Sequence, residues 1–172
     1  MPSIAVRHIA FALTLLVAVA GCRESEGELF EISGKKFIFN YRVATATYLL
    51  TLQPRGPMRE GDFFVATFEN PAGGDPIVVR NKIWPNMEKV VVESPPLSCV
   101  RKDRPYQVTI RIEDAAGTIR QTLQTTMTSN VDQDILPDRP LVVGPAYTPN
   151  PELGGRPDGK LADGANPTCP VS

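Results

Sequence analysis

Residues 106–128 contain the pattern that most constrains the fold of this chain. Apolar side chains alternate with polar ones at the start of this segment, at Tyr106, Val108, Ile110 and Ile112. Alternation with a period of two is typical of a strand with one buried face. A turn follows at Asp114-Ala115-Ala116-Gly117, where glycine can adopt a positive φ, and the threonine-rich return segment favours a second strand. Tyr106–Thr128 therefore predicts a β-hairpin.

Several shorter β-like segments precede this hairpin. Apolar and polar side chains alternate over residues 37–43, and apolar runs follow at residues 48–52, 63–68, 77–84 and 89–93. Clusters of proline, glycine and asparagine separate these runs, and no segment shows a helical period of any length. The pattern predicts an all-β chain in which about seven to eight short strands form a sandwich over residues 29–130.

One local feature resembles a known class of sandwich. Val100 lies six residues before Tyr106, across a polar turn that contains Pro105. This spacing resembles fibronectin type III and immunoglobulin-like domains, where a tyrosine hydroxyl at that place bonds back to the backbone. The chain departs from both families elsewhere, since Trp84 is not at their usual core tryptophan position and no cysteine pair has their inter-sheet spacing. The resemblance implies a single immunoglobulin-like β-sandwich.

Residues 131–172 differ in composition from the predicted sandwich. Eight prolines and five glycines fall between residues 137 and 172. Such a segment cannot build a core of its own. Leu141-Val142-Val143 and Tyr147 predict that part of it packs along the domain, and the alternative is an extended recognition segment for a partner.

The N-terminus has the features of a secretory signal. Arg7 precedes the apolar run Ile9–Ala20, which at about twelve residues is shorter than the roughly 20 that a transmembrane helix needs. Val19-Ala20-Gly21-Cys22 resembles the lipobox of bacterial lipoproteins, with Val19 where leucine is commoner. The resemblance implies that residues 1–21 are removed and that Cys22 carries lipid. Cleavage after Ala20, which would leave a soluble periplasmic protein, is the alternative.

The lipoprotein resemblance also implies a location. Arg23 follows the cysteine where aspartate would indicate inner-membrane retention, so we expect the periplasmic face of the outer membrane, with membrane lipid as one partner. Two or three acyl chains suffice for stable anchoring. Residues 22–28 would form a polar tether, whose six residues after the cysteine span at most about 20 Å.

The three cysteines limit the redox chemistry. They are Cys22, Cys99 and Cys169. If Cys22 carries lipid, the other two can pair as a disulfide and none is left over. Free or intermolecular thiols are the alternative, and the absence of a C-x-x-C motif gives no support to a redox-active pair.

Composition argues against several functions. The single histidine, His8, lies in the predicted signal. Its loss removes the serine and cysteine hydrolase mechanisms that need histidine, histidine-ligated zinc and a histidine pH switch. With 18 basic and 19 acidic side chains, the chain also lacks the positive charge that nucleic-acid binding requires.

The remaining polar candidates are weak, and we expect no catalytic, cofactor-binding or metal site. Asn130, Asp132 and Asp134 have the spacing of a calcium loop but lack its later glycine and glutamate. Glu88 and the Glu113-Asp114 pair are interpreted as exposed strand ends, because nothing fixes two carboxylates at a useful distance.

Two aromatic side chains are candidates for partner contact. Tryptophan is common in binding hot spots, so Trp84 suits an exposed anchor, although it suits the core equally well. Tyr147 in the C-terminal segment is the second candidate. The sequence favours a non-enzymatic binding or assembly module for a protein or an envelope component. A purely structural lipoprotein and a carboxylate-dependent hydrolase are the alternatives.

Overall fold

The computed structural model describes residues 27–161 and Cys169, and the chain in this part is all-β. Seven strands form two sheets. They are β1 (Phe30–Asn40), β2 (Thr45–Pro54), β3 (Phe63–Phe68), β4 (Ile77–Lys82), β5 (Val90–Glu93), β6 (Pro105–Glu113) and β7 (Ile119–Thr128). Two 3₁₀ turns, η1 (Gln133–Ile135) and η2 (Pro151–Leu153), and the short strands β8 (Val142–Val143) and β9 (Thr148–Pro149) follow them.

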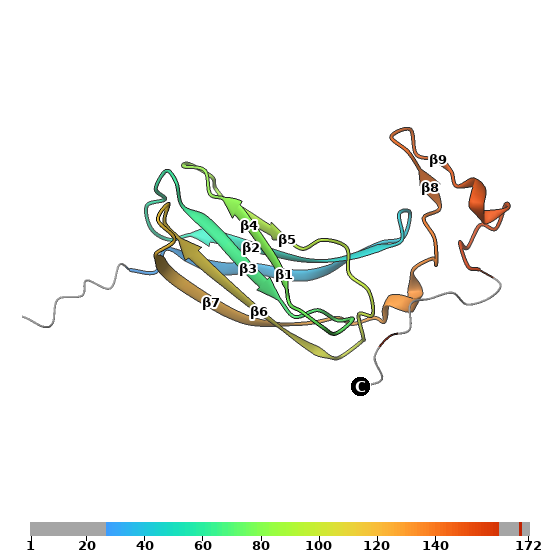
Figure 1. The fold of residues 1–172 in the computed structure, drawn as a ribbon, viewed down its shortest axis with the longest axis horizontal. Coiled ribbons are helices and arrows are strands. Elements are labelled where there is room, and N and C mark those ends of the chain that lie inside the picture. The colour runs from blue at the N-terminus through green and yellow to red at the C-terminus, as the bar shows by residue number, and fades with distance from the viewer. Residues whose placement is uncertain (1–26, 162–168, 170–172) are drawn as a thin grey trace, which may run out of the picture.

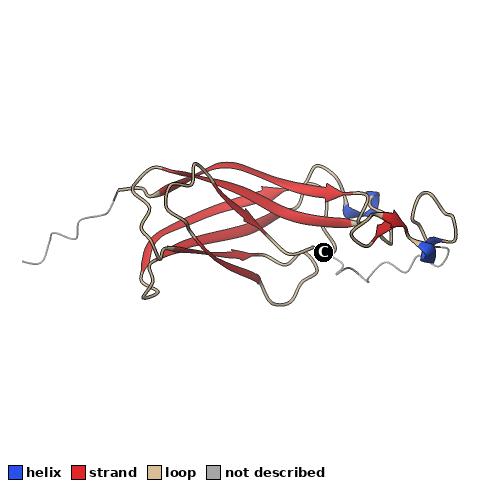
Figure 2. Ribbon diagram, turned by 90° about the horizontal axis from the view of Figure 1, so that it is seen from above, coloured by secondary structure: helices blue, strands red, loops and turns tan. Residues whose placement is uncertain are grey.

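The two sheets pack face to face as a sandwich (Figures 1 and 2). One sheet has the strand order β1-β2-β5, and the other has the order β4-β3-β6-β7. Every pairing between neighbouring strands in these sheets is antiparallel. The predicted all-β sandwich is therefore confirmed as the fold.

The predicted hairpin forms one half of the larger sheet, with β6 inside it and β7 at its edge. The four alternating apolar side chains of β6 are all buried, and β7 pairs with β6 from Thr128 opposite Pro105 to Ile119 opposite Glu113. In the turn, the Asp114 carboxylate accepts the N–H groups of Ala116 and Thr118, both at 2.9 Å. The hydrogen bond from Thr118 is the main cause that lowers the pKa of Asp114 below its usual range.

Aromatic side chains from both sheets meet in the core. The Tyr48 ring on β2 lies 4.8 Å from Phe37 and 5.1 Å from Phe68, centroid to centroid, and it meets Tyr106 edge-on at 6.2 Å. Its hydroxyl donates to the carbonyl of Glu69 at 3.0 Å. Burial raises the pKa of Tyr48 well above its usual range. The core thus excludes water while a hydrogen bond satisfies the Tyr48 hydroxyl.

The hydrogen bond that the family resemblance implies for Tyr106 is present. The Arg101 N–H donates to the Tyr106 hydroxyl oxygen at 2.8 Å. Val100 and Tyr106 are both almost completely buried. The bond ties the turn that enters β6 to the strand itself, and so fixes the path of the chain between the two sheets.

One side of the sandwich is closed by contacts between β1 and β7. The Gln121 side chain on β7 accepts the N–H groups of Leu29 and Phe30 and donates to the carbonyl of Phe30 at 2.7 Å. Lys35 reaches across from β1 to the carbonyl of Thr126, also at 2.7 Å. On the opposite side, no hydrogen bond joins β4 to β5 within the described residues, and each of these strands pairs with one neighbour only.

Residues 131–161 form a C-terminal arm beyond one end of the sandwich. Gln133 holds its start, because its side chain accepts the Val100 N–H and donates to the carbonyl of Leu97. Further along, the Leu141 N–H donates to the carbonyl of Arg42 at 2.8 Å, at the tip of the β1–β2 hairpin. Figure 1 shows β8 and β9 beside this tip. The arm is therefore fastened to the sandwich at separate points.

Two strand predictions need correction. The segment 37–43 was expected to remain a strand throughout, but β1 ends at Asn40 and Tyr41 lies exposed in the following turn. The strand expected over residues 77–84 ends at Lys82. Ile83 is fully buried, whereas Trp84 is 58% exposed, so the interpretation of Trp84 as a core residue is wrong. Successive side chains in extended backbone point to opposite sides, and Ile83 occupies the inward place.

Candidate partner-binding surfaces

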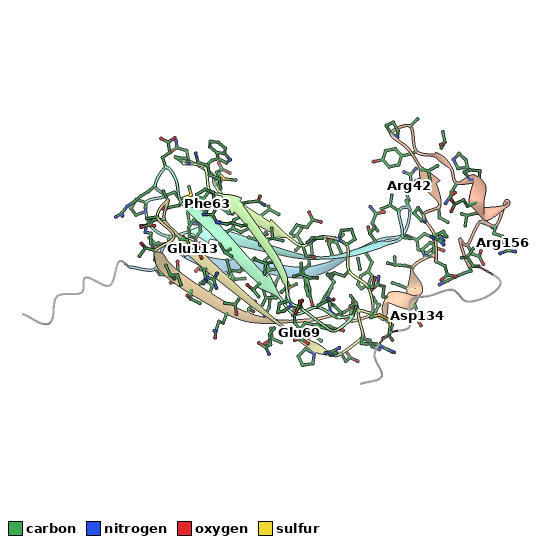
Figure 3. All side chains as sticks on the ribbon, viewed as in Figure 1. Arg42, Phe63, Glu69, Glu113, Asp134 and Arg156 are labelled. Carbon is green, nitrogen blue, oxygen red and sulfur yellow. A yellow bond between two sulfur atoms is a disulfide. The ribbon has the colours of Figure 1, made fainter. Side chains whose placement is uncertain are left out.

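The two aromatic candidates lie at opposite ends of the sandwich. Trp84 follows Lys82, whose register partner is Phe63, and Phe63 lies at the end where β1 begins (Figure 3). Tyr147 contacts Arg42, which lies at the far end. We call the first the proximal end and the second the distal end. Trp84 and Tyr147 therefore belong to two surfaces and not to one site.

At the proximal end, Trp84 carries a cation on its ring. The Lys82 Nζ atom lies 4.4 Å from the centroid of the indole. The indole is more than half exposed, so most of its apolar face remains open to solvent. An exposed tryptophan beside a cation is a surface that can contact a partner.

At the distal end, two neighbouring turns carry four exposed side chains, which we together call the distal tip. They are Tyr41 and Arg42 from the β1–β2 turn and Val143 and Tyr147 from the β8–β9 hairpin. Tyr41 and Tyr147 are 47% and 59% exposed, and the Arg42 guanidinium carbon lies 5.3 Å from the Tyr147 ring centroid. Two separate parts of the chain thus combine aromatic area with one cation.

The backbone holds Tyr147 in an unfavourable conformation. Its φ is 52°, in the left-handed region that bulky residues seldom occupy. Its N–H closes the turn on the carbonyl of Gly144 at 3.1 Å. A strained residue of this kind costs roughly 1–3 kcal/mol and is over-represented at functional positions. Burial does not compensate for this cost, since the ring is exposed.

The two remaining cysteines form a disulfide. Cys99 and Cys169 are joined, with 5.4 Å between their Cα atoms. This confirms the predicted pairing and links the chain just before β6 to a position beyond the arm. A hollow of about 460 Å³ lies beside the bond, lined in part by Ala44, Asp132 and Asp138.

Three of the carboxylates considered in the sequence accept hydrogen bonds in the structure, namely Asp114, Asp132 and Glu113. Asp132 accepts the Lys102 N–H at 2.9 Å, and Glu113 accepts from the Arg111 side chain at 3.1 Å. Asp138 in the hollow pairs with Lys160. Within residues 27–161 and Cys169, no group of three or more acidic, cysteine or histidine side chains is placed to hold a metal ion.

Sequence reasoning missed most of the distal tip. Tyr41 was assigned to a strand face, and Arg42 and Val143 were not singled out as surface residues. The one available signal was Tyr147, as a lone aromatic residue in a proline-rich segment. The contact between the β1–β2 turn and the arm joins residues about a hundred positions apart, and no sequence pattern encodes it.

The predicted lipidation site, Cys22, lies outside the described residues. No helix in the described part of the chain is long and apolar enough to cross a membrane. No protein-family model matches the chain, and no curated protein is significantly similar to it.

Proposed function

We propose that this protein is a lipid-anchored, non-enzymatic binding or assembly module on the periplasmic face of the outer membrane. The anchor would be the acylated Cys22. Its support is the lipobox-like Val19-Ala20-Gly21-Cys22 segment after a short apolar run. The Cys99–Cys169 disulfide supports an oxidising compartment such as the periplasm.

The fold gives this anchor a direction. Leu29 and β1 begin at the proximal end, so a membrane-bound Cys22 would hold that end within about 20 Å of the bilayer. The distal tip would then point away from the membrane. A protein or envelope component in the periplasm would meet the distal tip first.

The observation that carries the binding function is the exposed, strained Tyr147. A left-handed tyrosine with its ring in solvent has a cost to the folded chain that burial of the ring does not offset. Together with Arg42 and Tyr41 it offers the residue types that dominate protein–protein hot spots. A protein partner at the distal tip accounts for this arrangement.

Site-specific photocrosslinking in intact cells tests this function. A photoreactive phenylalanine analogue replaces Tyr147 or Tyr41 in the full-length chain, and Ser33, which is exposed on β1, serves as the control position. We expect the same discrete protein adduct from both distal positions and none from Ser33. Equal labelling at all three positions, or no adduct at the distal tip, would contradict the proposal.

The anchor is tested separately by mass spectrometry of the N-terminal peptide. We expect a diacylated or triacylated Cys22, and we expect the Cys22→Ala variant to leave the membrane fraction. An unmodified N-terminus at Gly21 would contradict the lipid anchor and would leave the crosslinking result to stand by itself.

A further inference from the structure

β4 is an edge strand with one unpaired side. It pairs with β3 over its whole length and ends the order β4-β3-β6-β7. In an antiparallel sheet, every second residue of such a strand directs its N–H and C=O groups away from its partner. Six residues of β4 therefore offer a ready template for one more strand.

The outward face of β4 carries a defined pattern of side chains. Val78, Arg80 and Lys82 lie on the solvent face, whereas Ile77 and Val79 pack toward the core. Val78 is 61% exposed. Read along the strand, the outer face thus presents one apolar side chain followed by two cations.

The cation of Arg80 is held in place without a carboxylate. Its guanidinium carbon lies 3.6 Å from the centroid of the Phe63 ring, and within the described residues no acidic side chain pairs with it. Stacking uses the flat face of the guanidinium and leaves its N–H edge available for a bidentate bond with a carboxylate.

Lys82 is similarly available. Its Nζ atom lies over the Trp84 ring, and its carboxylate contact, Glu60, is at 4.0 Å and 81% exposed. Such a long, solvated ion pair holds the ammonium weakly. Further along the sheet, Glu113 is occupied by Arg111 on β6. The edge of this sheet therefore carries two cations without a firm acidic partner.

From this arrangement we propose that β4 binds an extended acidic segment of a partner protein by β-strand addition. The added strand would run antiparallel to β4, with carboxylates opposite Lys82 and Arg80 and an apolar side chain opposite Val78. Its pattern, read from its N-terminus, is acidic–x–acidic–x–apolar. The strand backbone would supply affinity, and the three cross-strand pairs would supply selectivity.

Charges on an edge strand also deter unwanted pairing between sheets. Positive charges deter neutral and basic strands, whereas they attract an acidic one. This surface lies along the open side of the sandwich and not at the distal tip, so it does not depend on the function proposed above.

Fluorescence anisotropy with a designed peptide tests the inference. The probe is the labelled peptide Thr-Thr-Glu-Thr-Glu-Thr-Val-Thr-Thr, and the receptor is the full chain in detergent. We expect saturable binding that weakens when salt is raised, because exposed charges are screened. The same peptide with lysine in place of both glutamates is expected not to bind.

Matched variants locate the site. Arg80→Glu with Lys82→Glu is expected to weaken binding by about tenfold, because two attractions become repulsions. Lys36→Glu makes the same kind of charge change on the other sheet and is expected to leave binding unchanged. Melting temperatures of all variants report whether they fold. Hydrogen exchange should slow at the amides of residues 77–82 when the acidic peptide is bound.

Three outcomes would overturn the inference. The first is no binding of the acidic peptide, and the second is equal binding by the Arg80/Lys82 and Lys36 variants. The third is binding to phosphatidylglycerol vesicles that depends on Arg80 and Lys82 while the peptide leaves β4 exchange unaltered. That result would assign the two cations to a lipid surface.

Discussion

In the sandwich, Tyr48, Leu50 and Ile110 have no solvent exposure, whereas the C-terminal arm buries few large apolar side chains. Leu136 at the start of the arm belongs to the sandwich core, and Leu153 is buried apart from it. The sandwich is therefore stabilised by a shared apolar core, and most of the arm has no equivalent.

Individual hydrogen bonds hold the arm in place where apolar packing is lacking. Asn150 donates to the carbonyl of Pro140 and accepts the N–H of Glu152, and Lys160 donates to the carbonyl of Leu136 at 2.6 Å. Net contributions of single hydrogen bonds are about 0.5–1.5 kcal/mol each. We therefore expect the sandwich to unfold as a unit, and the arm to detach when a few contacts are lost. The distal tip, which needs the arm in place, depends on those contacts.

A matched pair of leucine truncations gives the largest expected contrast. Leu50→Ala removes a fully buried side chain from the shared core and should lower the free energy of unfolding by about 2–5 kcal/mol. Leu153→Ala removes the same atoms from the arm, and we expect the global unfolding free energy to change by less than about 1 kcal/mol, because the sandwich does not depend on it. Urea denaturation followed by Trp84 fluorescence measures both. Equal losses would show that arm and sandwich form one cooperative unit.

The disulfide is the second test, because it ties a position beyond the arm back to the sandwich in addition to the backbone. Cys99 and Cys169 are 70 positions apart, and the loop that they close includes β6, β7 and the arm. Replacing both with alanine should lower the free energy of unfolding by about 2–4 kcal/mol through the larger entropy of the unfolded chain. Hydrogen exchange should rise first in residues 131–161.

Reduction of the unaltered chain with dithiothreitol provides the control for the alanine substitutions. Reduction should lower the free energy of unfolding and raise hydrogen exchange in residues 131–161, as the alanine substitutions do. If exchange in the arm stays slow after reduction, the hydrogen bonds of Gln133, Asn150 and Lys160 are sufficient to hold it, and the comparison drawn above would need revision.

The contrast between the packed sandwich and the arm also explains which features could be predicted from the sequence. The Tyr106–Thr128 hairpin follows from local alternation and turn residues, and the Phe63–Phe68 strand follows from a continuous apolar run. The structure contains both. The disulfide followed from cysteine number. The exposure of Trp84 depends on whether Ile83 or Trp84 faces the core, which alternation alone leaves undetermined where a strand ends.

Longer-range features were not predictable in this way. The contact of Leu141 with Arg42 and the stacking of Arg80 on Phe63 arise from register and chain path. Neither leaves a periodic pattern in the sequence. The surfaces proposed for binding are built from such contacts, and so the fold was easier to predict than the sites.

The smallest expected effect comes from two tyrosine hydroxyls. Tyr106→Phe removes the acceptor of the Arg101 N–H in the sandwich and should cost about 1–2 kcal/mol, because the donor loses its partner in a partly buried position. Tyr147→Phe removes a hydroxyl from the exposed arm and should leave stability within about 0.5 kcal/mol of the parent. Chemical denaturation of each variant measures both changes in the free energy of unfolding. A cost at Tyr147 as large as that at Tyr106 would mean that the arm holds its tyrosine for folding, and the argument that Tyr147 is strained for binding would fail.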